Sequence, residues 1–326
     1  MPNLYNPDYL FHLASKYNLN PSKKYGQNYL IDEEILNKIL EVAAVTKDET
    51  IVEVGPGFGV LTFPLAERAG RVISFEIEKK LQPYWEEHGC HLERSERSLS
   101  DSTIMTEISR SARNDERNIE IVWGNVLKQF LNPNFQFPKF KVVANLPYQI
   151  TSAVIRLFLE TAPPPEAMVL MVQKEVAERI CAEPGEMSLL SVSVQYYAEP
   201  KLEFIVPRES FWPSPRVDSA VISIIPRQHT CHSERSEESL VSGGLRDPSA
   251  TPQDDIWSDD KNFFSLVKAG FANRRKLLTK NLEPFIGKEN KEKLRKIFEE
   301  LNFLPTIRAQ ELSVNDWIEL FRQLSF

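Results

Sequence analysis

The stretch Ile51–Gly59, with the sequence IVEVGPGFG, joins a short β-branched run to a turn with three glycines. The residues that follow it, Val60–Thr62, indicate the apolar start of a helix. Glycines let the backbone approach a ligand closely, and a helix amino terminus offers unpaired N–H donors. The spacing departs from the dinucleotide fingerprint G-x-G-x-x-G, because Val60 stands where the third glycine belongs. The stretch therefore predicts an open α/β sheet with a ligand at this turn.

Two further apolar runs end in residues that suit the same ligand. Val72–Phe75 leads into Glu76, and Ile119–Trp123 leads into Gly124 and Asn125. The carboxyl ends of parallel strands meet at one edge of a sheet, where such sheets bind ligands. Glu76 could accept both hydroxyls of a ribose there, and Asn125 could reach an adenine amine. The glycine spacing G-x-G-x-G together with these strand ends favours S-adenosylmethionine, because binding this cofactor requires no site for a pyrophosphate.

The tetrapeptide Asn145–Tyr148 (NLPY) follows a fourth apolar run, Lys141–Ala144. It offers the Asn145 side-chain oxygen, two main-chain carbonyls and the flat face of Tyr148. Such a corner can hold a planar ring that carries an amine. On these residues alone a structural interpretation stays open, in which Asn145 caps a helix over 149–160 and Tyr148 packs in the core.

Seven sequence blocks together resemble the ribosomal RNA adenine N6,N6-dimethyltransferase family. They occur in the family's order over nearly the whole chain, apart from two insertions: Lys24–Leu30, Glu53–Gly59, Phe75–Glu78, Asn145–Tyr148, Gln173–Arg179, Phe211–Ala220 and Phe271–Lys276. The resemblance implies an S-adenosylmethionine-dependent enzyme that dimethylates the N6 amines of two adjacent adenosines in a hairpin of small-subunit ribosomal RNA. It also implies the immature small ribosomal subunit as the partner.

The resemblance assigns roles to individual residues. For cofactor binding it implies Gln27, Asn28, Leu30, Gly55, Gly57, Glu76, Ile77, Asn125 and Asn145. For catalysis it implies that Asn145 Oδ1 and the Pro147 carbonyl accept hydrogen bonds from the target amine. Tyr148 would stack on the flipped base, and Phe211 would close the other face of the ring. By residue type alone, Gln27 and Asn28 could be simple turn residues, and Phe211 would more often pack in the core than cover a ligand.

One position departs from the family pattern, because Asn125 stands where the family carries aspartate. Asparagine keeps an acceptor oxygen and loses the charge. We expect weaker cofactor binding by roughly 1 kcal/mol, the difference between a charge-assisted and a neutral hydrogen bond.

The composition limits the classes of protein to which the chain can belong. The chain has 326 residues, three cysteines and a formal net charge of −7, so a disulfide framework is not expected. No apolar run is long enough to cross a membrane, and no signal-peptide core is present. We expect a cytoplasmic monomer without a membrane partner. Residues 229–260 carry eight acids and two arginines, so nearly all of the negative charge lies in one segment and does not exclude an RNA partner.

Two related polar segments interrupt the family pattern. The ten residues from Cys90 match the ten from Cys231 at eight positions, which indicates two copies of one repeat. We expect a polar insertion at about 88–118 and a disordered polar insertion at 229–257. A metal site built from the duplicated Cys-His pairs is disfavoured, because adjacent Cys and His chelate poorly and no further ligand pairs accompany them, so no metal is expected.

The remaining sequence predicts an α/β fold. Strands near 51–54, 71–76, 119–123, 140–144, 167–172, 201–206 and 217–225 alternate with helices, one of them capped by Asp32, and the last two strands should pair with each other. We expect a Rossmann-like class I methyltransferase domain over 1–228 and a small all-helical RNA-binding domain over 258–326, with Pro284 and Pro305 between helices. The basic residues expected to contact RNA phosphates are Lys23, Lys24, Lys268, Arg274, Arg275 and Lys276. An ordinary solvated helix face is the other interpretation of the last four.

Two other functions stay open at this point. One is a large-subunit adenine methyltransferase of the macrolide-resistance type, which shares the Asn-(Leu/Ile)-Pro-Tyr corner. The other is a non-catalytic protein of small-subunit assembly, which Asn125 and the two insertions would allow.

Overall fold

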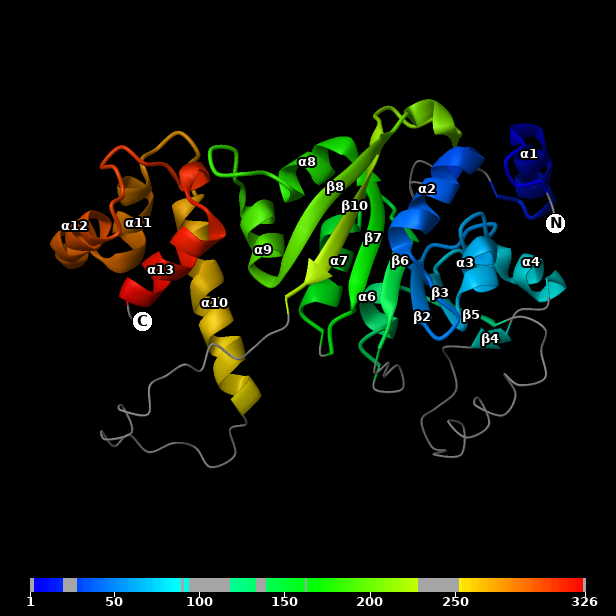
Figure 1. The fold of residues 1–326 in the computed structure, drawn as a ribbon, viewed down its shortest axis with the longest axis horizontal. Coiled ribbons are helices and arrows are strands. Elements are labelled where there is room, and N and C mark those ends of the chain that lie inside the picture. The colour runs from blue at the N-terminus through cyan, green and yellow to red at the C-terminus, as the bar shows by residue number, and fades with distance from the viewer. Residues whose placement is uncertain are drawn as a thin grey trace. The chain divides into compact units, whose positions relative to one another are not determined.

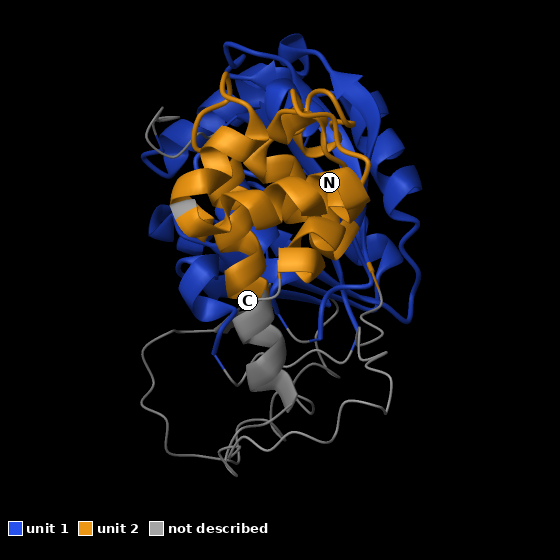
Figure 2. Cartoon of the chain, turned by 90° about the vertical axis from the view of Figure 1, so that its left-hand side faces the viewer, with its two compact units in different colours: residues 1–178, 199–226 blue, residues 179–198, 227–326 orange. Residues whose placement is uncertain are grey.

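The computed structural model describes residues 3–19, 28–88, 91–93, 118–132, 139–161, 163–227 and 252–324, without the side chains of 91–93, 252–259 and Lys288. The chain divides into two compact units, residues 1–178 with 199–226 and residues 179–198 with 227–326 (Figure 2). The division differs from the predicted ranges in one segment, because residues 179–198 belong to the helical unit.

The first unit contains an eight-stranded sheet in the order β4-β5-β3-β2-β6-β7-β10-β8 (Figure 1). Neighbours from β4 to β7 pair in parallel, and β10 pairs with β7 in antiparallel register. The strands are β2 (Thr50–Val54), β3 (Arg71–Glu76), β4 (His91–Glu93), β5 (Ile119–Trp123), β6 (Lys141–Asn145), β7 (Ala167–Gln173), β8 (Ala198–Val206) and β10 (Ser219–Pro226). This arrangement confirms the predicted Rossmann-like methyltransferase sheet and the adjacency of its last two strands.

The central strands are apolar throughout because both of their faces are covered. Ile51, Val52, Val72 and Ile73 are all completely buried, as is typical of the middle of a parallel sheet. Strands β2, β3, β5 and β6 pair in parallel within one buried layer, so their carboxyl ends lie at the same edge of the sheet.

Helix α2 (Glu33–Ala43) begins where the sequence predicts. The Asp32 carboxylate accepts hydrogen bonds from the main-chain N–H groups of Glu34 and Ile35, at 3.1 and 3.2 Å. One face of this helix, with Ile35, Leu36, Ile39 and Leu40, is buried. The other helices in or bordering this unit are α1 (Pro7–Lys16), α3 (Thr62–Arg68), α4 (Gln82–Glu87), α6 (Val126–Gln129), α7 (Thr151–Leu159) and α8 (Lys174–Ile180).

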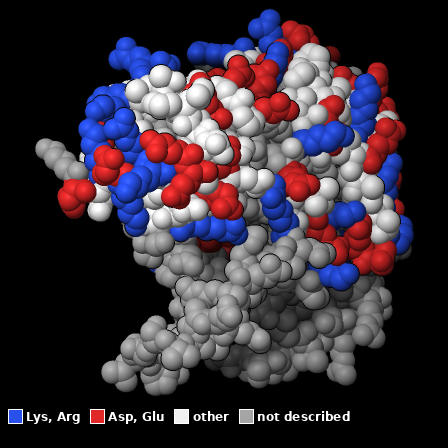
Figure 3. Space-filling view, turned by 60° about the vertical axis from the view of Figure 1, so that its left-hand side comes forward, with Lys and Arg blue, Asp and Glu red and all other residues white. Residues whose placement is uncertain are grey.

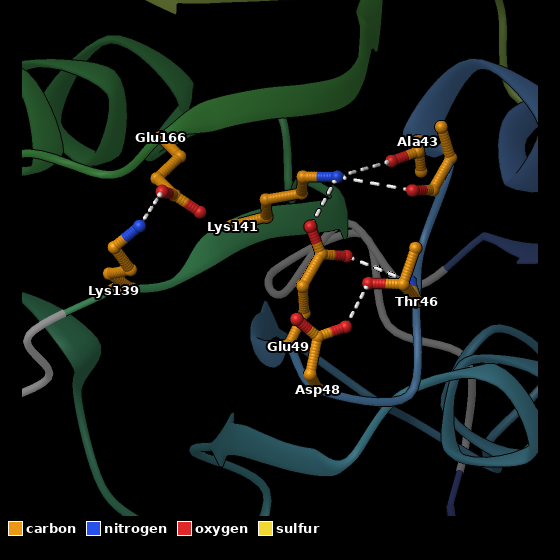
Figure 4. Close-up of polar contacts among 8 residues, drawn as sticks. Ala43, Thr46, Asp48, Glu49, Lys139, Lys141 and Glu166 are labelled. Carbon is orange, nitrogen blue, oxygen red and sulfur yellow. Dashed lines mark hydrogen bonds and ion pairs between the residues drawn. The ribbon is translucent and has the colours of Figure 1, made fainter.

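Lys141, the first residue of β6, ties this strand to the end of α2 (Figure 4). Its Nζ donates to the carbonyls of Ala43 and Ala44, at 3.2 and 3.1 Å, and pairs with Glu49 Oε1 at 2.8 Å. Both side chains of the ion pair are less than one-fifth exposed. The lysine therefore satisfies carbonyls that α2 leaves without a partner, and it anchors the strand whose other end carries Asn145.

The region of the first predicted insertion contains regular structure. Strand β4 lies within residues 88–118 and pairs in parallel with β5. The first predicted insertion, about 88–118, therefore includes one short strand of the sheet. Residues 94–117 lie outside the described part of the chain, as do 228–251 of the second insertion.

The second unit is helical. It contains α9 (Leu189–Tyr197), α10 (Pro252–Gly270), α11 (Leu278–Ile286), α12 (Lys291–Glu300) and α13 (Val314–Leu324). Its core includes the fully buried Trp317 and Phe263. The buried Asp260 accepts hydrogen bonds from the hydroxyls of Tyr196 and Tyr197, both at 2.8 Å, which joins α9 to α10.

Two predictions for the helical unit need correction. Helix α10 begins at Pro252, so the end of the predicted insertion is helical, with proline in the first turn, where its missing N–H costs nothing. Pro284 lies inside α11 and does not separate two helices. None of the helices among the described residues is long and apolar enough to cross a membrane.

Candidate active site

One cavity in the first unit collects nearly all of the described residues that the sequence assigns to cofactor binding and catalysis. It lies at the carboxyl ends of β2, β3, β5 and β6. Its lining includes the predicted residues Asn28, Leu30, Gly55, Gly57, Glu76, Ile77, Asn125, Asn145, Pro147 and Tyr148. Four strand ends meet there because the strands are parallel neighbours, as a ligand site in an open α/β sheet requires.

The glycine turn requires glycine for two reasons at Gly57. Its φ of +55° is rarely adopted by residues with a side chain, and a Cβ atom there would lie 2.9 Å from a ring carbon of Tyr29. Its main-chain N–H donates to Glu76 Oε2 at 3.2 Å. The turn therefore packs against one cavity residue and positions the carboxylate of another.

Glu76 is a buried carboxylate at the end of β3. It accepts hydrogen bonds from the main-chain N–H groups of Gly57 and Glu78, the latter at 2.7 Å. Burial raises the pKa of Glu76 to about 7, although the hydrogen bonds favour its charged form. Next to it, Ile77 is 53% exposed, which is unusual for a large apolar side chain and leaves an apolar surface for a flat ring beside the carboxylate.

Asn125 lines the cavity and also caps a helix. Its Oδ1 accepts the main-chain N–H of Leu127 at 3.0 Å, at the start of α6. The oxygen expected to receive an adenine amine is therefore already hydrogen-bonded. An aspartate would have a second oxygen for a ligand. The structure therefore gives a reason to expect weaker cofactor binding with asparagine at this position.

The corner Asn145–Tyr148 presents acceptors and an aromatic ring. Asn145 Nδ2 donates to the Asn28 carbonyl at 3.3 Å, which leaves Oδ1 as the acceptor of this side chain. The carbonyl of Pro147 accepts from Ile150 N at 3.1 Å and from Thr151 Oγ1 at 3.3 Å. None of the described residues donates to the Leu146 carbonyl. The structural interpretation of Asn145 as a helix cap is wrong, because α7 begins at Thr151 without a side-chain cap.

Tyr148 is held by its hydroxyl. The hydroxyl lies 3.0 Å from Ser219 Oγ at the start of β10, and burial raises the pKa of this tyrosine. The hydrogen bond fixes the end of the ring, so its face has a defined orientation at the cavity.

Phe211 does not line the cavity. It is 3% exposed and pairs with Leu30, because β1 (Tyr29–Leu30) and β9 (Phe211–Trp212) form a two-stranded sheet. Its neighbour Ser210 donates to Asp32 Oδ2 at 2.8 Å. In this structure the segment around Phe211 therefore secures the N-terminal edge of the cavity.

Glu53 and Tyr29 are among the cavity residues that the sequence does not assign to the site. Glu53 is buried and accepts hydrogen bonds from Thr62 Oγ1 at 2.7 Å and Ser74 Oγ at 2.6 Å. Burial raises the pKa of Glu53 to about 7. The sequence signal that could have identified Glu53 is an acidic residue inside an otherwise apolar strand.

The basic residues predicted to contact RNA fall in two groups. Lys268, Arg274, Arg275 and Lys276 are exposed in the second unit, and no acid of the described residues pairs with them. The last three lie in the connection between α10 and α11, which corrects the expected helix. Figure 3 shows Lys and Arg mixed with Asp and Glu on the face in view. Lys23, Lys24 and Gln27 lie outside the described residues.

A metal site is not formed within the described part of the chain. No group of three or more His, Cys, Asp or Glu side chains could hold a metal ion there. The side chains of the duplicated Cys-His pairs fall outside it.

Comparisons with known proteins agree on one family. A model described as ribosomal RNA adenine dimethylase matches residues 18–242. The chain is 35% identical over 310 residues to the ribosomal RNA small subunit methyltransferase A of Lactococcus lactis subsp. lactis, with 94% of this chain and 91% of that protein covered. It is 36% identical over 306 residues to the protein of the same name from Dehalococcoides mccartyi, with 92% and 87% covered.

Solved structures agree at the level of the fold. A dimethyladenosine transferase from Plasmodium falciparum matches with a TM-score of 0.60 and 24% identity, covering 89% of this chain and 95% of that chain. The 23S rRNA methyltransferase ErmE matches with a TM-score of 0.58 and 24% identity, covering 91% and 99%.

Proposed function

Since this chain belongs to the ribosomal RNA adenine dimethylase family and is an S-adenosylmethionine-dependent enzyme that dimethylates adenine in ribosomal RNA, we propose that its target is two adjacent adenosines in a hairpin of the small-subunit RNA. The modification would belong to small-subunit maturation in the cytoplasm, with the enzyme acting as a monomer on the immature subunit. The observation that carries the proposal is the meeting of the glycine turn, Glu76 and the Asn145–Tyr148 corner at one cavity.

The cavity offers a suitable residue for each part of the cofactor. Glu76 would accept the ribose hydroxyls, Ile77 would cover the adenine, and the turn at Gly55 and Gly57 would face the methionine end. Asn28 and Leu30 border the same cavity, and we assign them, with Gln27, to the cofactor as well. When bound, the cofactor supplies the methyl group on its sulfonium.

The target amine needs help because its lone pair is delocalised into the adenine ring. Acceptors aimed at its two hydrogens favour a pyramidal nitrogen and align it with the methyl group. Asn145 Oδ1 is one acceptor. The predicted second acceptor, the Pro147 carbonyl, would have to exchange one of its two hydrogen bonds, whereas the Leu146 carbonyl receives none from the described residues. The amine becomes acidic once methylated, so its proton can pass to water.

The flipped adenine would stack on Tyr148, which Ser219 holds by its hydroxyl. Phe211 was expected on the other face of the ring. Its burial in the β1–β9 pair means that this role would require a rearrangement when RNA binds.

RNA contact is the proposed role of the exposed basic residues Lys268, Arg274, Arg275 and Lys276, together with Lys23 and Lys24. Four cations without acidic partners among the described residues suit phosphate oxygens, and such contacts position an RNA without reading its sequence.

The small-subunit target is favoured over the large-subunit alternative by relatives at 35–36% identity that are named for the small subunit. ErmE, named for 23S rRNA, is less similar at 24% identity. A purely non-catalytic assembly protein is disfavoured, because the acceptor corner and the cofactor residues are all present.

Methyl transfer to immature small subunits that lack the modification tests the proposal. Purified enzyme with radiolabelled S-adenosylmethionine should label the small-subunit RNA, and mapping should find two neighbouring dimethyladenosines. Naked large-subunit RNA is the competing substrate, and the Asn145→Ala enzyme is the inactive control. Labelling of the large-subunit RNA alone would contradict the proposed target.

A further inference from the structure

A second hollow in the first unit has no role in the mechanism above. It lies between the start of α8 and the segment that leads into β10, and we call it the α8 hollow. Its lining consists of Lys174, Glu175, Glu178, 207–209 and 216–218. All of these residues belong to the first unit. Charged side chains from two separate segments therefore face one surface site.

The order of the strands places the α8 hollow next to the active-site corner. Strand β6 carries Asn145, and the cofactor residues follow β2, β3 and β5 on one side of it (Figure 1). On the other side β7 pairs in parallel with β6, and Lys174 directly follows the last residue of β7. The hollow thus lies at the same edge of the sheet as the corner, on the side away from the cofactor residues. An RNA whose target base enters the corner needs a path on this side, because the cofactor occupies the other.

Arg216 lies within reach of a nucleotide bound at the corner. It precedes Ser219 by three residues, and Ser219 Oγ lies 3.0 Å from the hydroxyl of Tyr148. Three residues of extended chain span at most about 11 Å, and the long arginine side chain adds to this reach. A base stacked on Tyr148 therefore brings its neighbouring phosphates close to Arg216.

The segment that carries Arg216 is braced at both ends. Asp218 Oδ1 accepts the main-chain N–H of Arg208 at 3.1 Å, and the Asp218 carbonyl accepts the N–H of Lys174 at 3.0 Å. Ser214 Oγ donates to the Arg208 carbonyl at 2.9 Å. Because these bonds fix the backbone before a ligand arrives, little order has to be gained on binding.

Arg216 is the cation of the α8 hollow that is available to a ligand. Arg208 pairs with Glu209 at 2.9 Å, and Lys174 lies 3.9 Å from Glu178. Arg216 is exposed, and no carboxylate of the described residues pairs with it. Its guanidinium offers a planar fork of donors that matches two phosphate oxygens. Four acids and three cations line the hollow, so a phosphate contact there depends on this one fork and not on a basic field.

We propose that the α8 hollow receives the RNA backbone next to the target adenosine, and that Arg216 binds one of its phosphates. The inference rests on the proposed function, because it takes the target base to stack on Tyr148. It gives the first unit an RNA contact of its own, separate from the basic residues of the second unit. Such a contact positions the nucleotide at the corner without reading its sequence.

Arg216→Gln tests the inference in filter binding to immature small subunits. The dissociation constant should rise about five- to tenfold, as for the loss of one charge-assisted contact. The slope of its logarithm against the logarithm of the KCl concentration should fall by about 0.7–0.9, the value for one phosphate. Arg216→Lys keeps the charge and should keep the wild-type slope. The melting temperature and the S-adenosylmethionine dissociation constant should not change in either variant, because this side chain is exposed and lies outside the cofactor cavity.

Lys201→Met is the matched control, because it removes the same charge from the first unit. Lys201 lies in β8 outside the α8 hollow, is 73% exposed and pairs with Glu203 at 2.8 Å. Its loss should leave the dissociation constant within about twofold of wild type and the salt slope unchanged. Equal effects of Lys201→Met and Arg216→Gln would reflect net charge alone and would overturn the inference.

Two other results would also overturn it. One is a wild-type dissociation constant and salt slope in Arg216→Gln. The other is weaker binding with an unchanged salt slope, which would place a protein and not a phosphate in the α8 hollow. Failure of the proposed function is a separate result, because wild-type enzyme would then label only large-subunit RNA. The binding comparison is made on the RNA that wild type methylates, so it decides the role of Arg216 in either case.

Discussion

Acidification should weaken cofactor binding through Glu76. Its pKa is about 7 in the cofactor-free protein, because burial outweighs the hydrogen bonds from main-chain N–H groups. Ribose hydroxyls that donate to the carboxylate stabilise its charged form, so the pKa falls in the complex. At a pH between the pKa of Glu76 in the complex and its pKa in the free protein, the complex binds fewer protons than the free protein. The affinity for the cofactor therefore rises with pH until about 7.

The magnitude follows from the fraction of ionised carboxylate. With a pKa of about 7, the fraction ionised is about 0.9 at pH 8 and about 0.1 at pH 6, so the dissociation constant should rise about tenfold between them, or about 1.4 kcal/mol. Glu76→Gln keeps an acceptor and loses the charge, which should cost roughly 1 kcal/mol at pH 8 and remove the part of the pH dependence that comes from Glu76.

The same residue affects folding with the opposite sign. Because the pKa of Glu76 in the folded protein is raised above the ordinary glutamate value of 4.5, the folded protein binds the extra proton. The contribution of Glu76 to the free energy of unfolding is therefore fully present below pH 4.5 and is lost as pH rises through 7. Without cofactor, that loss is at most about 3 kcal/mol.

Titration calorimetry at pH 6, 7 and 8 and constant ionic strength measures the binding effect. All other titratable groups are the same in wild type and Glu76→Gln, so the difference between their slopes isolates the carboxylate. A wild-type dissociation constant that stays constant from pH 8 to pH 6, or a Glu76→Gln protein that keeps the wild-type slope, would refute the reasoning.

Three further substitutions have expected outcomes. Asn145→Ala should cut turnover roughly 100-fold with RNA affinity little changed, because an acceptor used in the transition state is lost; near-normal single-turnover rates would show that the corner is not the active site. Asn125→Asp should tighten S-adenosylmethionine by up to about 1 kcal/mol, since one oxygen keeps the helix cap while the other meets the adenine amine; weaker binding by calorimetry would contradict this placement. Lys141→Met should lower the free energy of unfolding by about 1–3 kcal/mol, because Glu49 and two helix carbonyls lose their partner. The neighbouring Lys139→Met, whose ion pair with Glu166 is exposed (Figure 4), should change it by less than about 0.5 kcal/mol in the same denaturant titration.

The sequence by itself determined the central strands of the sheet and the edge of the sheet that carries the site. Continuous apolar runs identify buried parallel strands, and Asp32 marks a helix start, because these signals depend on neighbours along the chain. The residues that follow the strands had to meet, since carboxyl ends of parallel strands share one edge. For that reason Glu76, Asn125 and Asn145 could be placed together before any coordinates.

The tertiary structure decided what each side chain contacts. Asn145 donates to a carbonyl 117 positions away, the Asn125 oxygen is taken by a helix cap, and Phe211 is buried against Leu30. The raised pKa values of Glu53 and Glu76 depend on burial by segments far apart in sequence. Burial and hydrogen-bond partners are properties of packing in three dimensions, so no pattern of neighbouring residues reports them.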